Sequence, residues 1–533
     1  MSNPGSQPCG AAAIRATRGV IDCARRQQRW VLTAAVLAST MAFVDESVVN
    51  VALPRIQTDL GTTLAAMQWV VNAYTLCMSA LLLVGGAAGD QLGRRRMFLM
   101  GVGIFALASL GCGLAPNAEV LIVARAVQGV GAAFLIPCSL AIIGAAFHEA
   151  ERGAAIGIWS GASALAAGLG PLLGGWLVDH TSWRAIFLIN PLLAVIALWI
   201  GLRHLPESRD PDAAPGIDWR GALLVFAGLG ALVYGLIEAA VVGWHDPWVL
   251  GSMIAGAALL VVFVIAEHHS HAPMMPLALF RSVSFSGINL VTLLLYGALG
   301  GAFFFVPFLL IQVHGFSATA AGAAFLPFAL ILGVLSRRSG RLADHIGVRW
   351  PLIIGPALVG LGFALLAYAS SSPRYSAVLL PMIVLGFGMV ITVTPLTTTV
   401  INAVPEHQTG IASGINNAVA SVASLLMIAV LGTVALSALG RSLDQELASG
   451  SIPREMAPVI DGARGGFVTP TMPASLSEAE RHAGRAVIGR AFADAIRLVM
   501  LIASGLALAS ALIAALTIRN AQPERKKNRS PPH

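Results

Sequence analysis

Long apolar runs are the feature that most limits what this sequence can fold into. A helix needs roughly 20 apolar residues to cross the roughly 30 Å hydrocarbon core of a bilayer, and runs that meet or approach that length recur along all 533 residues. Only 11% of the residues are charged and the mean hydropathy is +0.79, whereas soluble proteins carry about 25% charged residues. The pattern predicts an all-α polytopic membrane protein with 14 transmembrane helices.

The predicted spans fall into groups of six, two and six. The first group is 30–53, 67–88, 97–114, 119–147, 154–178 and 185–202, the second is 221–240 and 248–266, and the third is 285–312, 318–335, 351–369, 376–400, 410–439 and 496–516. These groups predict five segments, namely an N-terminal tail (1–29), a six-helix bundle (30–202), a linker with two extra spans (203–284), a second six-helix bundle (285–518) with an external loop (441–490), and a basic tail (519–533). A capping box from Ser475 to Glu478 predicts that a helix begins there and runs into the last span.

Arginines mark alternate connections between the spans. Cytoplasmic loops are enriched in Lys and Arg, and one set of loops holds Arg94, Arg95, Arg96, Arg152, Arg203, Arg209, Arg220, Arg281, Arg337, Arg338, Arg341 and Arg349. The other short loops offer only Arg55, Arg184 and Arg374. This asymmetry predicts a multi-pass protein of the cytoplasmic (inner) membrane with both termini in the cytoplasm. The basic loops are expected to meet anionic inner-leaflet lipids, not nucleic acid, because no single basic face forms.

Several other classes of protein find no support in the sequence. The five cysteines show no CxxC spacing, so neither a disulfide framework nor a metal site is expected. There is no Walker motif, which argues against ATP as a direct energy source, and no cofactor is expected. No clustered nucleophile and base is evident, so no catalytic residues are predicted and the chain is not expected to be an enzyme.

A short polar motif occurs twice at a constant offset of 254 residues. Its first copy contains Gly86, Asp90, Gly93 and Arg95, and its second copy contains Gly340, Asp344, Gly347 and Arg349. Both copies follow the second span of a six-span group. Two parallel six-helix halves are the architecture of a transporter that rocks about a substrate path near the membrane midplane.

Further motifs occur in order along the first half. They are residues 44–54 (VDESVVNVALP), Gly86-x-x-x-Asp90-x-x-Gly93-Arg94-Arg95, Arg125-x-x-Gln128-Gly129-x-Gly131, Gly170-Pro171-x-x-Gly174-Gly175 and Trp183-Arg184-x-x-Phe187-x-x-Asn190-Pro191. With these motifs the sequence resembles the major facilitator superfamily, and specifically its fourteen-helix drug:proton antiporters of the multidrug efflux type. The resemblance runs from about residue 30 to the last span. It implies the major facilitator fold, two six-helix bundles plus two inserted central helices.

Three ionisable residues inside predicted spans are the candidates for proton coupling. Charge within a span is costly and marks ion or substrate pathways. Helical rise places Asp45 roughly 14 Å and Arg125 roughly 9 Å below the outer surface, so contact between them is feasible. Asp45 is predicted to carry the coupling proton, with Arg125 setting its proton affinity; the alternative is a static ion pair. Glu46 faces a different neighbour, where it could attract a cationic substrate, share the proton work or lie in water at the outer mouth.

The repeated loop motif is predicted to act as a conformational latch. A carboxylate at Asp90 or Asp344 can accept from the first amides of the next helix while it pairs with arginine across the interface between the halves. The latch residues are Gly86, Asp90, Gly93, Arg94, Arg95, Gly340, Asp344, Gly347 and Arg349. The alternative is that the arginines only anchor the loops at the membrane surface.

Two apolar features complete the candidates. The glycines and proline of the fifth span (Gly170, Pro171, Gly174, Gly175) resemble the antiporter motif, which implies a seal against leakage; tight packing alone is the alternative. Adjacent phenylalanines at 303–305 and 308 could line an apolar site, although some are expected to meet lipid. Predicted spans 9 to 13 hold no acidic residue, so the proton site is expected in the first half.

The predicted function is proton-coupled export of drugs or amphipathic small molecules, apolar or cationic, by alternating access, as in antibiotic resistance. A dedicated exporter of one metabolite or antibiotic, and a membrane receptor or sensor that reuses the fold, remain alternatives. A receptor should keep the ligand cavity without needing Asp45. Whether a periplasmic adaptor protein takes part stays open.

Overall fold

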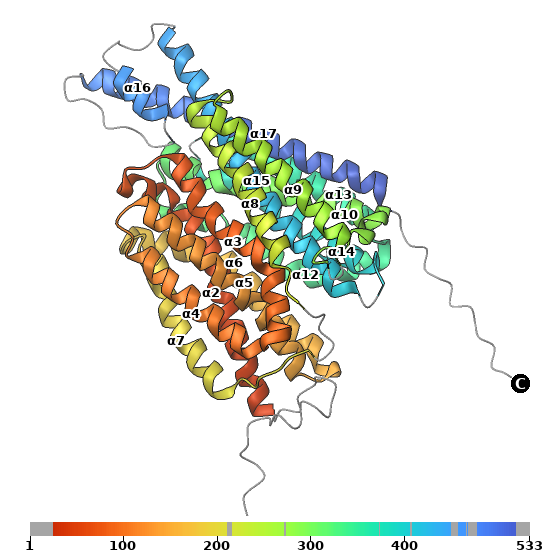
Figure 1. Cartoon of the computed structure of the whole chain (residues 1–533). Coiled ribbons are helices and arrows are strands. Elements are labelled where there is room, and N and C mark those ends of the chain that lie inside the picture. The colour runs from red at the N-terminus through yellow and green to blue at the C-terminus, as the bar shows by residue number, and fades with distance from the viewer. Residues whose placement is uncertain are drawn as a thin grey trace, which may run out of the picture.

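The computed structural model describes residues 25–210, 216–270, 273–372, 374–405, 408–448, 457–464, 466 and 477–518. Within these residues every regular element is helical, and fourteen helices are long and apolar enough to cross a membrane. The predicted all-α fold with fourteen spans is confirmed. Figure 1 shows the helices of the first half and those of the second half as two bundles side by side.

The first half of the chain forms a bundle of six helices. They are α2 (Arg25–Leu60), α3 (Leu64–Leu92), α4 (Arg94–Gly113), α5 (Ala118–Ala146), α6 (Glu149–His180) and α7 (Ala185–His204). Glycines let α3 and α5 approach closely, since a Cβ on Gly129 would lie 2.3 Å from the carbonyl oxygen of Tyr74 and one on Gly85 would lie 2.0 Å from that of Ala133. Such close contacts hold helices together in lipid, where apolar surface gains nothing by leaving the solvent.

The second half repeats the bundle with one broken span. Its helices are α10 (Val283–Phe308), the π-helical turn η2 (Leu309–Val313), α11 (Ala318–Ala323), α12 (Leu326–Ile346), α13 (Arg349–Ala369), α14 (Tyr375–Asn402), α15 (Thr409–Ala448) and α17 (Glu478–Thr517), with the short helix η1 (Leu277–Arg281) before α10. The predicted span 318–335 is divided between α11 and α12. The backbone amide of Phe325 donates to Gly322 three residues back instead of four, which ends the first helical piece.

The two inserted helices, α8 (Trp219–Val242) and α9 (Pro247–His269), lie at the junction of the halves. Apolar side chains of α8 pack against α3 of the first half and α15 of the second in one cluster, which includes Leu76, Leu229, Val233, Leu425 and Ala429. The outer face of α9 stays exposed for lipid, with Ile254 69% and Val261 58% accessible. The inserted pair therefore bridges both bundles along one side.

The segment before the last span is more helical than predicted. Where the sequence indicated an external loop over 441–490, α15 continues to Ala448, α16 spans Ala457–Arg464, and α17 begins at Glu478. The predicted helix that runs into the last span is confirmed from Glu478 onward, whereas Ser475 of the predicted capping box lies outside the described residues. Val459 and Ala463 give α16 a buried face, so this short helix packs onto the neighbouring helices.

The two halves meet on one side of the membrane and part on the other. An even number of spans puts the start of α2 and the end of α17 on the same side, here named the terminal side; the opposite side is the far side. On the far side a Cβ on Gly175 of α6 would lie 2.1 Å from the carbonyl oxygen of Ala318 of α11. On the terminal side a cavity of about 820 Å³ separates α3, α5 and α6 from α15. The conformation is open toward the terminal side.

Candidate functional site

A carboxylate, an arginine and two amides form a closed polar cluster inside the first bundle. Asp45 of α2 is ion-paired with Arg125 of α5, and both side chains are almost fully buried. The other carboxylate oxygen of Asp45 accepts hydrogen bonds from Nε2 of Gln128 and Nδ2 of Asn190, each 2.8 Å long. Three N–H groups thus converge on Asp45, an environment that suits the ionised carboxylate.

Arg125 is held by partners on several sides. Its Nη1 also donates to Oε1 of Gln128 at 2.8 Å, and its Nε donates to the backbone carbonyl of Val70 at 3.1 Å. The guanidinium carbon lies 4.3 Å from the ring centroid of Tyr74, a distance at which the ring face attracts a cation. The guanidinium is therefore fixed in position opposite Asp45.

Glu46 follows Asp45 directly but lies in a different environment. Its side chain is exposed, and its carboxylate has no hydrogen bond or ion pair among the residues that the structure describes. It lies one helical turn before Asn50, so both side chains project from the same side of α2. The two adjacent acids of α2 thus differ, since Asp45 is enclosed by donors and Glu46 has no such partner among the described residues.

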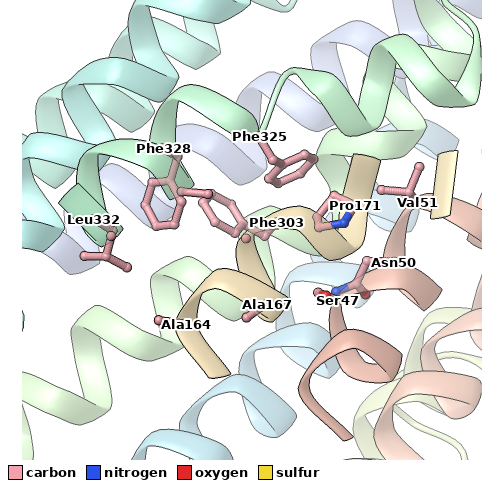
Figure 2. Close-up of a pocket in the computed structure, with 13 residues that line it drawn as sticks. Ser47, Asn50, Val51, Ala164, Ala167, Pro171, Phe303, Phe325, Phe328 and Leu332 are labelled. Atoms are coloured by element: carbon pink, nitrogen blue, oxygen red, sulfur yellow. The ribbon is translucent and has the colours of Figure 1, made fainter. Parts of the chain in front are cut away.

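An apolar cavity of about 230 Å³ lies between the two halves (Figure 2). The first half supplies Ser47, Asn50, Val51, Ala164, Ala167, Gly168 and Pro171, and the second supplies Phe303, Phe325, Phe328, Ala329, Leu332 and Gly333. Phe325 and Phe328 pack edge-on against Phe303, with ring centroids 5.3 and 5.2 Å apart. The cavity thus has a wall of aromatic rings on one side and two small polar side chains on the other.

The neighbours of Phe303 do not reach lipid as the sequence suggested. Phe304, Phe305 and Phe308 are at most 1% exposed and pack inside the bundle. The expectation that some of these phenylalanines meet lipid is therefore wrong for these three, because α10 is surrounded by other helices at this level.

This chain is similar to known proteins over most of its length. Residues 35–428 match the family described as Major Facilitator Superfamily. The chain is 37% identical over 424 residues to the multidrug resistance protein Stp of Mycobacterium tuberculosis, covering 79% of this chain and 78% of that protein. It is 32% identical over 504 residues to the tetracenomycin C resistance and export protein of Streptomyces glaucescens, covering 93% and 92%. This chain belongs to the major facilitator superfamily.

The superfamily assignment agrees with the similarity to solved structures. A bacterial homologue of the human lysosomal transporter Spinster, in an inward-facing and unoccupied conformation, gives a TM-score of 0.66 at 16% identity and covers 94% of this chain and 100% of that one. The fold of this chain is that of a major facilitator transporter. Two of its relatives are named for drug resistance or for resistance and export.

The first copy of the loop motif in this transporter forms contacts within its own half. Asp90 pairs with Arg94 at 2.7 Å, while the backbone amides of Arg95 and Arg96, in the first turn of α4, donate to Glu207 at 3.0 and 3.2 Å. The expectation that Asp90 caps this helix and pairs across the halves is wrong in this conformation. Glu207, from the segment after α7 in the same half, accepts from this helix end instead.

The later glycine of each copy occupies a backbone position that favours glycine. Gly93 has a φ of +120° and Gly347 a φ of +79°. At Gly93 a Cβ would also lie 2.7 Å from the Glu207 carboxylate. In the second copy Arg349 donates to the backbone carbonyl of Ala515 at 3.1 Å. The side chain of Asp344 and the surroundings of Gly340 are not among the described parts of the structure.

The motif of the fifth span lies where α6 contacts helices of both halves. A Cβ on Gly170 would lie 1.8 Å from the hydroxyl of Ser47, and one on Gly174 would lie 3.0 Å from the carbonyl of Val48. Pro171 lines the apolar cavity. The motif residues thus allow α6 to pack against α2 on one side and, through Gly175, against α11 on the other.

Proposed function

We propose that the protein exports amphipathic small molecules, apolar or cationic, in exchange for protons, with its terminal side in the cytoplasm. The observation that carries the proposal is the closed cluster of Asp45, Arg125, Gln128 and Asn190, which shares helix α2 with the polar side of a cavity with aromatic walls. Ionisable groups at such depth are kept where an ion or substrate passes. The resistance functions in the names of the relatives support the drug-like class of the substrate.

In the proposed cycle Asp45 exchanges the coupling proton. Protonation of Asp45 would remove the charge that attracts Arg125. The protonated carboxyl group would also carry an O–H that needs an acceptor, although three N–H donors surround it. The contacts between α2 and α5 would then weaken, which favours a change in access. Glu46, whose carboxylate has no hydrogen bond or ion pair within the described residues, would attract the positive end of a cationic substrate, while the phenylalanines would contact the apolar body of the substrate.

Transport by purified protein in proteoliposomes tests the proton role. Under an imposed pH gradient, Asp45→Asn is expected to bind substrate but to lose gradient-driven accumulation. Glu119→Gln is the control, because Glu119 is an exposed acid at the far-side start of α5, the same helix that carries Arg125. Accumulation by Asp45→Asn that still follows the pH gradient would remove Asp45 from the coupling step.

A dedicated exporter of a single compound is the second candidate. It is favoured by the volume of the apolar cavity, about 230 Å³, which is below the roughly 300–1,000 Å³ of common ligand clefts. It is also supported by a relative with the name puromycin resistance protein pur8, from Streptomyces alboniger, which is 37% identical over 415 residues. Accumulation of a broad panel of compounds, with and without a protonophore, separates the two candidates, since a dedicated exporter would act on one chemical type.

A further inference from the structure

Two carboxyl groups of the inserted helix pair face each other on the terminal side. Asp218 precedes α8 and caps it, because its Oδ1 accepts from the backbone amide of Gly221 at 2.8 Å. Glu267 lies in the last turn of α9 and is only 3% exposed. A Cβ on Gly221 would lie 2.5 Å from Oδ2 of Asp218 and 3.1 Å from Oε1 of Glu267, so both oxygens surround the same small space.

Each carboxyl group has one oxygen bound to a backbone amide and one directed at the other acid. Oε2 of Glu267 accepts from the amide of Met275 at 2.8 Å, whereas its buried Oε1 has no donor. Asp218 is close enough to Glu267 for the two carboxyl groups to interact electrostatically. Within the described residues no lysine, arginine or histidine is paired with either acid.

A proton is the ligand that satisfies this arrangement. Two ionised carboxylates that share a site repel each other, and a buried acceptor without a donor is costly. If one of the two acids is protonated, its O–H donates to the facing oxygen of the other, and both penalties are removed. A single proton then belongs to the pair and not to one residue.

We propose that Asp218 and Glu267 form a second proton-binding site, outside the Asp45 cluster and on the inserted helices. Asp218 and Met274 line the 820 Å³ cavity of the terminal side. The shared proton would therefore link the start of α8 to the end of α9 in the wall of this cavity. The site also adjoins the latch loop, because Nε2 of Gln91 donates to the carbonyl of Gly216 at 2.9 Å. The inserted helices would thereby bind a proton at a site separate from both six-helix halves.

Infrared difference spectra of the purified full chain in lipid nanodiscs, recorded between acidic and alkaline buffer without substrate, test this site. The wild type is expected to show the carbonyl stretch of a protonated carboxyl group that disappears as the pH rises. Glu267→Gln and Asp218→Asn each replace the shared proton by an amide donor of the same shape, so each is expected to lose the signal of one protonated carboxyl group per chain.

Asp246→Asn is the matched control. Asp246 caps α9 as Asp218 caps α8, accepting from the amides of Trp248 and Val249 at 2.8 and 3.3 Å, but no acid is hydrogen-bonded to it within the described part of the chain. Its substitution should leave the signal unchanged. The proposal is overturned if Glu267→Gln and Asp218→Asn retain the full wild-type signal, or if Asp246→Asn lowers it equally. The absence of any pH-dependent carboxyl signal in the wild type also overturns the proposal, because it means that no carboxyl group exchanges a proton, whatever the outcome of transport assays with Asp45→Asn.

Discussion

Tyr74 shows how a residue without charge can determine the properties of a charged site. Its ring supports Arg125 at 4.3 Å, and its hydroxyl has no hydrogen-bond partner among the described residues. Tyr74→Phe keeps the ring and should preserve stability, whereas Tyr74→Leu removes the ring face and should lose about 0.5–2 kcal/mol of the attraction to the cation. Thermal unfolding of the purified variants measures the difference; equal stability of the Phe and Leu variants would contradict the role of the ring.

Glu46 and Asp45 are adjacent in sequence but are expected to respond differently to substitution. Because Glu46 is exposed and unpaired, Glu46→Gln should reduce transport of cationic compounds and leave neutral ones nearly unchanged. Asp45→Asn should affect both classes, since it removes the proposed coupling proton. The two variants are compared in the same proteoliposomes with one cationic and one neutral substrate. An equal loss for both substrates in Glu46→Gln would exclude a role in charge selection.

At the residue scale the sequence identified the charges but not their surroundings. Asp45 and Arg125 could be predicted as neighbours, because charge is rare in spans and the helical rise gives their depth. Tyr74 and Glu207 could not. Their roles arise from contacts of α3 with α5 and of the loop after α7 with α4, which depend on how the helices pack. For Tyr74, the sequence offers a polar aromatic residue in an apolar span, one helical turn after Val70, whose carbonyl accepts from Arg125.

At the scale of the element, α6 offers a comparison within a single helix. A Cβ on Gly175 would lie 2.1 Å from the carbonyl of Ala318, whereas one on Gly161 would meet nothing within 4 Å. Gly175→Ala should therefore separate α6 from α11 and weaken the far-side closure, while Gly161→Ala should be neutral. Solvent access to a cysteine introduced at the far-side end of α6 reports the closure. Unchanged access in Gly175→Ala would show that α6 can shift without opening this side.

Helix existence followed from the sequence more reliably than helix ends. Hydropathy is an average over a window, so it detects each span but not the break between α11 and α12, which arises where Gly322 packs against the carbonyl of Pro171. The extension of α15 to Ala448 was missed for a related reason. Its last turns are polar and leave the membrane, and a polar helix held by tertiary contacts has no hydropathy signal.

At the scale of the whole molecule, the conformation depends on the side of the membrane at which contacts join the two halves. On the far side the carboxylate of Asp179, near the end of α6, accepts from the amides of Ala318 and Thr319 at 3.1 and 2.7 Å and from the Thr319 hydroxyl at 2.6 Å. These donors form the N-terminus of α11, whose dipole also favours an anion. Asp179 thus links the halves where they must separate when the protein opens to the far side.

Asp179→Ala is therefore expected to shift the protein away from the conformation open on the terminal side. Asp179 is exposed, so water replaces part of what is lost, and the net contribution of its hydrogen bonds is about 1 kcal/mol, a roughly fivefold change in the ratio of the two conformations. Distances between spin labels on the far-side ends of α6 and α11, measured by pulsed electron resonance, report that ratio. Asp59→Ala is the control, because among the described residues the ion-pair partner of Asp59 is Arg55 of its own helix, at 3.1 Å. If Asp179→Ala leaves the distance distribution as Asp59→Ala does, the closure rests on the packing of Gly175 and Gly322 and not on the bridging carboxylate.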